Sequence, residues 1–158
     1  MKISIDGWDA GIRFVSGHFL PSVEKCNRLH GHNYALTIIV EGEPDKNGII
    51  LDFIRLKEAA GKLTERVDHR MILPASGKSM VIRRNGESVS VRFGGKRYLF
   101  PASDVVMLPL ENVSAEELSA YFTEELAGSG LFGTNVRSIS VGVSEGRGQE
   151  AWTERHLM

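Results

Sequence analysis

Two stretches of the chain alternate between apolar and polar positions, as half-buried β-strands do. In residues 11–19, the even positions from Ile12 to His18 share one face. Residues 32–41 are rich in β-branched and aromatic side chains, and their even positions likewise share a face, to which His30 would belong if the strand began earlier. The turn-forming sequence PDKNG follows. The pattern therefore predicts two strands early in the chain.

Two later stretches have a helical period. The first begins after Asp52, a plausible N-cap, and its apolar residues are Phe53, Leu56, Ala60, Leu63 and Val67. The second begins at Ser114, where the sequence SAEE has the form of a capping box, and Gly128 ends it. Residues 135–145 and 150–157 read as two further strands.

The region between the helices, residues 79–107, has a different pattern. Asn85-Gly86 separates two alternating runs, which is a strong hairpin signal, and Gly94-Gly95 leads to a possible third strand. This is more structure than a helix connection needs, so we expect a β insertion. The element order then predicts one α+β domain over residues 1–158, a four-stranded antiparallel sheet backed by two helices.

Composition narrows the class of protein. The 158 residues carry 19 basic and 20 acidic side chains, with a net charge of -1 and no basic run, so no nucleic-acid partner is expected. No apolar run approaches the ~18 residues of a membrane span, and the N-terminus does not resemble a signal peptide. The single cysteine cannot form an internal disulfide, which is typical of a cytoplasmic protein with a reduced thiol.

The histidines suggest a metal site. His30 and His32 are two residues apart, so in a strand both imidazoles point to one side. His18 ends the preceding predicted strand, and antiparallel pairing could bring it opposite them. Three histidines with an open fourth position describe a catalytic zinc site. The alternative is that these are polar residues on a strand rim.

Other polar residues leave several readings open. Cys26 could be a fourth metal ligand, a buried inert thiol, or a nucleophile or base activated by a nearby imidazole. Asp68 could orient the ring of His69 as a proton carrier, or His69 could simply favour a helix C-terminus. Glu145 taken alone is a solvated acid at a strand end, and Ser114 a helix N-cap.

Six segments stand in an order that one enzyme family shares. They are FVSGH (14–18), CNRLHGHNY (26–34), GIILDF (48–53), VDHR (67–70), SAEELSAYF (114–122) and VSE (143–145). They cover most of the chain outside the insertion, and the spacing C-x-x-x-H-G-H with an upstream His and a downstream Asp-His is quite specific. The sequence thus resembles the 6-pyruvoyl-tetrahydropterin synthase and 6-carboxy-tetrahydropterin synthase family.

The resemblance implies a tunnelling-fold enzyme that acts on 7,8-dihydroneopterin triphosphate. Subunits of this family form barrels, commonly a hexamer of two stacked trimers, with active sites at subunit interfaces. The motifs imply these roles: zinc ligands His18, His30 and His32; catalytic residues Cys26, Asp68 and His69; and Glu145 binding the pterin ring. Ser114 and Ala115 fall where a Thr-containing stretch of a neighbouring subunit usually helps hold the pterin.

The family branches differ in product. The short spacing between Cys26 and His30 most resembles the branch that forms 6-carboxytetrahydropterin and acetaldehyde for 7-deazaguanine nucleosides. The 6-pyruvoyl branch is the alternative, and a zinc scaffold that binds a pterin or purine without turnover is a second one. A third branch, which makes 6-hydroxymethyl-dihydropterin, places Glu near or instead of the thiol, whereas residues 27–29 contain no acid. A generic zinc hydrolase has no support, because the chain has no H-E-x-x-H motif.

Overall fold

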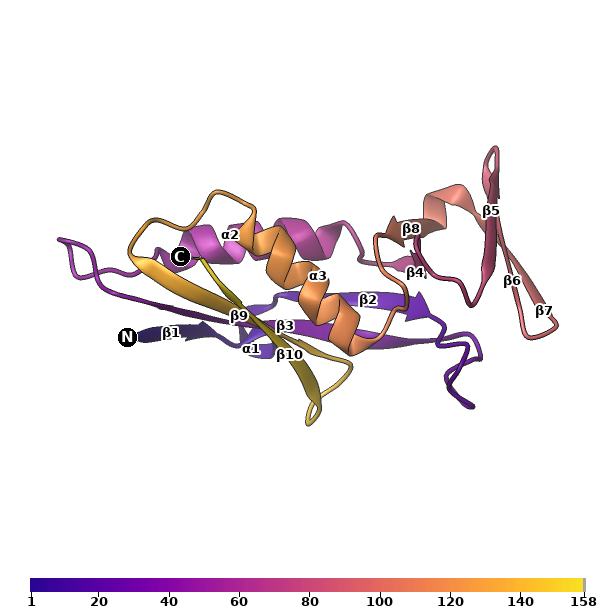
Figure 1. Cartoon of the computed structure of the whole chain (residues 1–158), viewed down its shortest axis with the longest axis horizontal. Coiled ribbons are helices and arrows are strands. Elements are labelled where there is room, and N and C mark those ends of the chain that lie inside the picture. Colours follow the sequence, from indigo (N-terminus) through magenta and orange to yellow (C-terminus); the bar gives the residue numbers. More distant parts are fainter. Residues whose placement is uncertain (158) are drawn as a thin grey trace.

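The computed structural model describes residues 1–157 as a large curved sheet with helices on one face and a small second sheet at one end (Figure 1). The strands are β1 (Lys2–Ile5), β2 (Arg13–His18), β3 (His30–Gly42), β4 (Arg70–Pro74), β5 (Val81–Asn85), β6 (Ser88–Phe93), β7 (Lys96–Pro101), β8 (Val105–Leu108), β9 (Val136–Ser144) and β10 (Glu150–His156). The helices are α1 (Gly7–Ala10), α2 (Phe53–Glu65) and α3 (Ala115–Ala127), with a 3-10 turn η1 (Ala102–Asp104).

The main sheet contains the four predicted strands but is larger than predicted. Its order is β10-β9-β3-β2-β4-β8, and β1 also pairs with β3, which makes seven strands. The four predicted strands β10, β9, β3 and β2 are consecutive antiparallel neighbours, whereas β4 and β8 are added in parallel. The prediction of a four-stranded, purely antiparallel sheet was therefore wrong in strand number and in direction.

The strands β1, β4 and β8 were not predicted, and β4 and β8 are short apolar runs. The sequences RMILP of β4 and VVML of β8 are almost wholly apolar and do not alternate with polar residues. A run of four or five apolar residues has no readable period, so neither strand could be distinguished from loop or helix. Parallel pairing also needs a long crossover, and α2 supplies the one between β2 and β4. The short helix α1 was missed as well.

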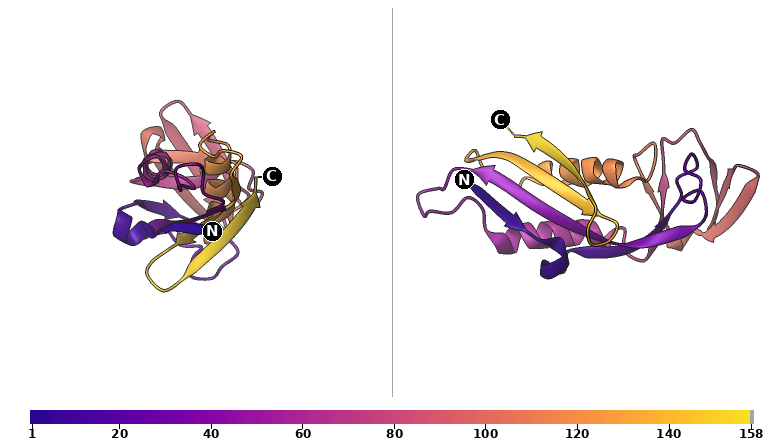
Figure 2. Two further views of the ribbon diagram at one scale, coloured as in Figure 1. Left: turned by 90° about the vertical axis from the view of Figure 1, so that its left-hand side faces the viewer. Right: turned by 90° about the horizontal axis from the view of Figure 1, so that it is seen from below.

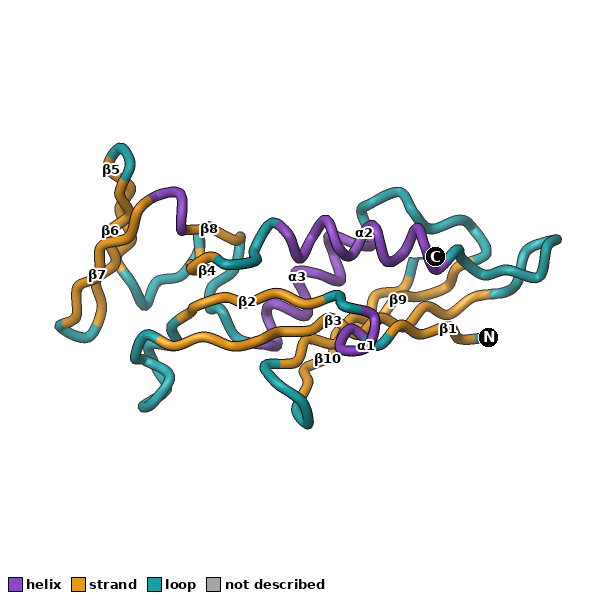
Figure 3. Tube along the Cα trace, turned by 180° about the vertical axis from the view of Figure 1, so that it is seen from behind, coloured by secondary structure: helices purple, strands orange, loops and turns teal. Residues whose placement is uncertain are grey.

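Both long helices cover the same face of the main sheet (Figure 3). Leu56 of α2 and Phe122 of α3 are buried in one apolar core with Phe14 of β2 and Leu36 of β3. Both predicted caps are present, since Asp52 accepts from the Ile54 N–H and Ser114 from the Glu117 N–H. No helix within residues 1–157 is long and apolar enough to cross a membrane.

The inserted strands β5, β6 and β7 form a separate antiparallel sheet. It lies at the end of the molecule away from both termini, beside the loop that joins β2 to β3 (Figure 2). A second apolar core joins it to the main sheet and includes Phe19, Met71, Val91 and Phe93. The predicted insertion extended to residue 107, but residues 105–108 form β8 of the main sheet.

Candidate metal centre and active site

Three histidines converge on the helix-covered face of the main sheet. His18 is the direct antiparallel partner of His30, and His32 stands opposite Ser16. Alternation along β3 puts His30 and His32 on the same side, where His18 also points. One ligand atom from each ring lies within 4.8 Å of the other two. The predicted trio is thus assembled by strand register alone.

The backbone fixes which nitrogen of two rings is free. His18 Nδ1 lies 2.6 Å from the Val113 carbonyl oxygen, and His30 Nδ1 lies 2.8 Å from the Arg28 carbonyl oxygen. A carbonyl can only accept, so each Nδ1 carries the proton and each Nε2 keeps a lone pair. Both Nε2 atoms are buried and have no hydrogen-bond partner among residues 1–157. Such orphaned acceptors fit a bound metal ion.

Burial keeps His18 neutral. Desolvation, with a smaller contribution from the neighbouring imidazoles of His30 and His32, lowers the pKa of His18 to about 4 against the opposing effect of the hydrogen bond to Val113. The ring is therefore uncharged at neutral pH, which is the form that binds a metal ion.

Gly31 is needed for this geometry. A Cβ atom at Gly31 would lie 2.6 Å from the Ser16 carbonyl oxygen, so any side chain there would force β2 away from β3. The glycine between the two histidines therefore lets the strands approach until His18 and His30 meet.

Glu145, just past the end of β9, joins the cluster from a third strand. Its carboxylate oxygens lie 3.9 Å from His18 Nε2 and 3.8 Å from His32 Nε2. It also lines a hollow of about 290 Å³ together with Ser114 and Ala115. The structure thus brings the three predicted substrate-binding residues together within one chain, next to the histidines.

Two residues near this cluster were not found from the sequence. Trp8 of α1 donates from Nε1 to Ser144 Oγ at 3.0 Å, and the Arg147 guanidinium lies over the Trp8 ring. Trp8 thus contacts residues that precede and follow Glu145 in the sequence. Tyr34 stands on the histidine face of β3, and its buried hydroxyl has no partner in the described part of the chain. Burial raises the pKa of Tyr34, and nearby Glu145 adds to this. Only the parity of Tyr34 with His30 and His32 could have indicated it.

Cys26 lies in the loop between β2 and β3 and is partly buried. Its carbonyl accepts from the Leu20 N–H at 2.8 Å, which closes the loop. Within residues 1–157, the group of side chains close enough to share a metal contains the three histidines and not Cys26. The structure therefore does not place Cys26 as a fourth ligand.

Asp68 and His69 pair with each other but not with the cluster. Asp68 Oδ2 lies 2.9 Å from His69 Nδ1, and Asp68 Oδ1 accepts from the Val15 N–H at 2.7 Å. Although burial raises the pKa of the Asp68 carboxyl, these bonds outweigh it and hold the pKa below its ordinary value. His69 has a positive φ of 55°, and its side chain is 80% exposed.

The Asp68–His69 pair lies on the other face of the sheet. His69 lines a hollow of about 370 Å³ with Val15, Gly17 and Gly31, and His30 borders it. Val15, Gly17 and Gly31 alternate with the metal-site histidines along β2 and β3, so the hollow opens on the opposite face. One chain therefore does not unite all the predicted catalytic residues.

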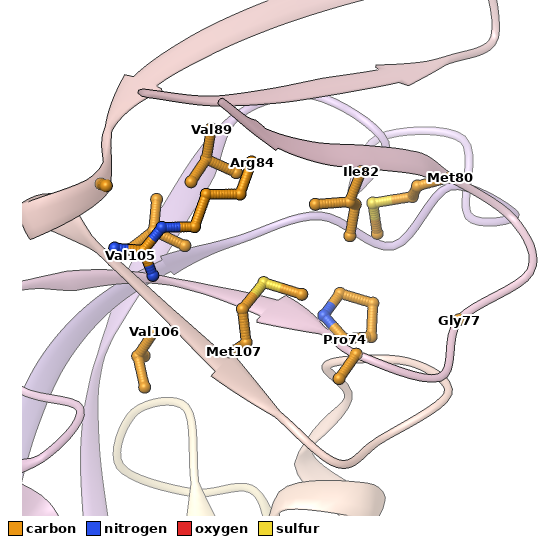
Figure 4. Close-up of a pocket in the computed structure, with 11 residues that line it drawn as sticks. Pro74, Gly77, Met80, Ile82, Arg84, Val89, Val105, Val106 and Met107 are labelled. Carbon is orange, nitrogen blue, oxygen red and sulfur yellow. The ribbon is translucent and has the colours of Figure 1, made fainter. Parts of the chain in front are cut away.

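A cavity of about 500 Å³, larger than the hollows beside Glu145 and His69, lies elsewhere (Figure 4). It lies between the inserted sheet and the edge formed by β4 and β8, and Arg84 is the only charged residue among those that line it. None of the predicted site residues borders it, and its lining holds no histidine, thiol or carboxylate. Cavity size alone would therefore have directed attention away from the histidine cluster and Glu145.

Comparison with known proteins agrees with this geometry. A protein of Methanocaldococcus jannaschii named "Putative 6-carboxy-5,6,7,8-tetrahydropterin synthase" is 29% identical over 99% of this chain and 98% of its own length. The 6-carboxy-5,6,7,8-tetrahydropterin synthase of Rickettsia felis is 31% identical over 82% of this chain and 86% of its own. A shorter match, 40% identical over 48 residues, links 30% of this chain to 41% of the dihydroneopterin monophosphate aldolase of Pyrococcus furiosus.

Solved structures share the fold over its whole length. The 6-pyruvoyl tetrahydropterin synthase of Plasmodium falciparum superposes with a TM-score of 0.90 at 27% identity, covering 99% of this chain and 98% of that one. This coverage includes the inserted sheet. The family model for 6-pyruvoyl tetrahydropterin synthase matches residues 10–156, which contain every predicted site residue. The chain belongs to the 6-pyruvoyl tetrahydropterin synthase family.

Proposed function

We propose that this protein is a zinc-dependent 6-carboxy-5,6,7,8-tetrahydropterin synthase. It would convert 7,8-dihydroneopterin triphosphate to 6-carboxytetrahydropterin, acetaldehyde and triphosphate. The observation that carries the proposal is the cluster of His18, His30 and His32, with two orphaned Nε2 atoms, beside the Glu145 carboxylate. Relatives named for this activity match most of the chain, which supports the product.

The residues of the cluster would bind the metal and orient the pterin. His18, His30 and His32 would hold zinc through Nε2, and the ion would lower the pKa of the side-chain hydroxyls of the substrate. The Glu145 carboxylate would accept two N–H groups from the amide and amidine edge of the pterin, which fixes the ring in its plane. Ser114 and Ala115 would border that ring in the same hollow.

Proton transfer would use the thiol and the Asp68–His69 pair. The Asp68 carboxylate accepts the Nδ1 proton of His69, which leaves Nε2 to take or give a proton. Because the pair faces away from the cluster in its own chain, we propose that it serves the cluster of a neighbouring subunit, while Cys26 serves its own. This arrangement requires an oligomer, and the family resemblance favours a hexamer.

Two other activities follow from the same comparisons. The P. falciparum structure favours 6-pyruvoyl-tetrahydropterin synthesis from the same substrate. The local match to the P. furiosus aldolase favours retro-aldol cleavage of dihydroneopterin monophosphate. All three activities would use the same metal centre and differ in the bond that breaks.

The test is product identification. Purified zinc-loaded protein is incubated with 7,8-dihydroneopterin triphosphate and, separately, with the monophosphate, and products are identified by mass spectrometry. Acetaldehyde with a 6-carboxy pterin is the expected result, and Cys26→Ala should remove it while zinc is retained. A 6-pyruvoyl or 6-hydroxymethyl product would reassign the activity. No turnover with zinc bound would leave a pterin-binding protein.

A further inference from the structure

The inserted sheet touches the loop that carries Cys26 at a specific point. Lys96, the first residue of β7, donates from Nζ to the Asn27 carbonyl oxygen at 2.8 Å and to Asn27 Oδ1 at 2.5 Å. The two residues are 69 positions apart in the sequence. Lys96 is only partly exposed and its Nζ also lies 5.5 Å from the centre of the Phe93 ring. Because the Lys96 ammonium group is partly shielded from water, its charge-assisted hydrogen bonds to Asn27 are stronger than those of a fully exposed lysine.

The hairpin that presents Lys96 has a fixed shape. Phe93 pairs with Lys96 across a two-residue turn, Gly94-Gly95, in which φ is 53° and 77°. A turn with positive φ at both central residues matches the twist of the flanking strands, and glycine adopts it without strain. Phe93 itself is buried against Phe19, with the ring centres 5.1 Å apart. Phe19 directly follows His18, so the hairpin is tied to the metal-site strand.

Asn27 stands between two groups that the proposed chemistry needs. Cys26 precedes it, and the carbonyl of Arg28, which follows it, accepts the Nδ1 proton of His30. The loop also has backbone hydrogen bonds of its own, including Asn27 N–H to the Val23 carbonyl oxygen at 2.8 Å and Leu20 N–H to the Cys26 carbonyl oxygen. Within residues 1–157, two side chains of other elements make hydrogen bonds to residues 20–28: His30, at the start of β3, to the Arg28 carbonyl oxygen, and Lys96 to Asn27.

We propose that Lys96 is a positioning residue, through which the inserted sheet holds the Cys26 loop against the metal site. The inference rests on the proposed function, because it assigns Lys96 a part in catalysis by Cys26. The inserted sheet would then form part of the active site and would not be a hairpin without a function. Phe100 of β7 and Asp104 of η1 line the hollow beside His69, so this end of the insertion also lies next to the proposed proton carrier His69.

The test compares Lys96→Met with Arg97→Met in the full-length zinc-loaded protein. Arg97 is the exposed neighbour of Lys96, and no hydrogen bond or ion pair of its side chain is present in residues 1–157, so it is a matched control. Two quantities are measured: hydrogen exchange of the backbone amides of residues 20–28 by mass spectrometry, and kcat and KM for the pterin triphosphate.

In Lys96→Met we expect loop exchange about 5-fold faster, the change typical of losing a hydrogen bond. We expect kcat about 10-fold lower with little change in KM, because small misplacement of a catalytic group costs rate. Zinc content should not change, and Lys96→Arg, which keeps the charge and the donors, should recover most of the kcat. Asn27→Ala should speed loop exchange less, since the backbone acceptor remains.

Unchanged loop exchange in Lys96→Met relative to Arg97→Met would overturn the proposal. So would equal kcat losses in Lys96→Met and Lys96→Arg, which would assign the loss to hairpin shape. If the wild-type protein turns over no pterin, the proposed function fails. The exchange measurement would still show whether Lys96 holds the loop.

Discussion

The three histidines of β2 and β3 and the Asp68–His69 pair lie on opposite faces of one sheet, and they differ in burial and in the partners of their side chains. The histidines lie on the helix-covered face, where His18 is 1% exposed and has its Nδ1 proton fixed by the Val113 carbonyl. His69 lies on the other face with an 80% exposed side chain, and its hydrogen-bonded contact is with Asp68 next to it. The three histidines meet within one chain, whereas the Asp68–His69 pair stands apart from them.

The difference in burial suits the two groups to different roles, metal binding and proton transfer. A metal centre needs ligands with fixed lone pairs and low proton affinity, and burial between strand and helix provides both. A proton carrier needs access to the substrate and a partner that fixes its tautomer, which Asp68 supplies. In the proposed oligomer, a neighbouring subunit would cover His69. Removing one member of each group should therefore have different consequences.

The largest effect is expected from His18→Ala. This change removes the buried ligand, and zinc affinity should fall by more than about 100-fold, because even outer-shell changes cost 10- to 100-fold. Zinc content by atomic absorption and pterin turnover should be lost together. Full zinc content in the variant would show that His18 is not a ligand.

His69→Ala should lower kcat by about 100-fold or more, the usual contribution of a general acid or base, while zinc content stays at the wild-type level. Mixing this variant with His18→Ala under conditions that exchange subunits should restore part of the activity, because some sites would combine intact groups from two chains. No recovery, in mixtures shown by native mass spectrometry to contain both chains, would contradict the shared site.

Acid should destabilise the zinc-free protein through His18. The pKa of His18 is about 4 in the folded chain, against an ordinary value near 6.5, so the unfolded chain binds the extra proton first. Stability is therefore full above pH 6.5 and declines toward pH 4, by roughly 3 kcal/mol from this group. Urea unfolding across this range measures it. His18→Gln should flatten the slope, and an unchanged slope would assign the acid sensitivity to other groups.

Gly31→Ala should disturb the close approach of β2 and β3 that brings His18 and His30 together. Its Cβ would meet the Ser16 carbonyl oxygen at 2.6 Å, and such overpacking costs about 1–3 kcal/mol of unfolding free energy. Urea unfolding and zinc affinity should both weaken. Gly61→Ala is the matched control, since a Cβ there meets nothing within 4 Å and α2 should become slightly more stable. Equal stability of the two variants would contradict the steric argument.

Much of the fold was readable because long elements have clear periods. The strands now seen as β2, β3, β9 and β10, both long helices and the hairpin of the insertion were predicted close to their observed positions. The strands β1, β4 and β8 were not, and in β4 and β8 a run of four or five mostly apolar residues has no readable period. The Asn85-Gly86 signal found the hairpin, although its two-residue loop is Gly86-Glu87.

The sequence by itself determined the ligand types and their parity. His30 and His32 must share a face of any strand that contains both, and a chain with one cysteine has one candidate thiol. Only the tertiary structure decided which nitrogen is free, that Glu145 reaches the cluster, that Lys96 contacts Asn27, and that Asp68 and His69 lie on the other face. Apart from the bond between His30 and the nearby Arg28 carbonyl, these features depend on contacts between residues tens of positions apart, which packing and strand order set and local pattern does not contain.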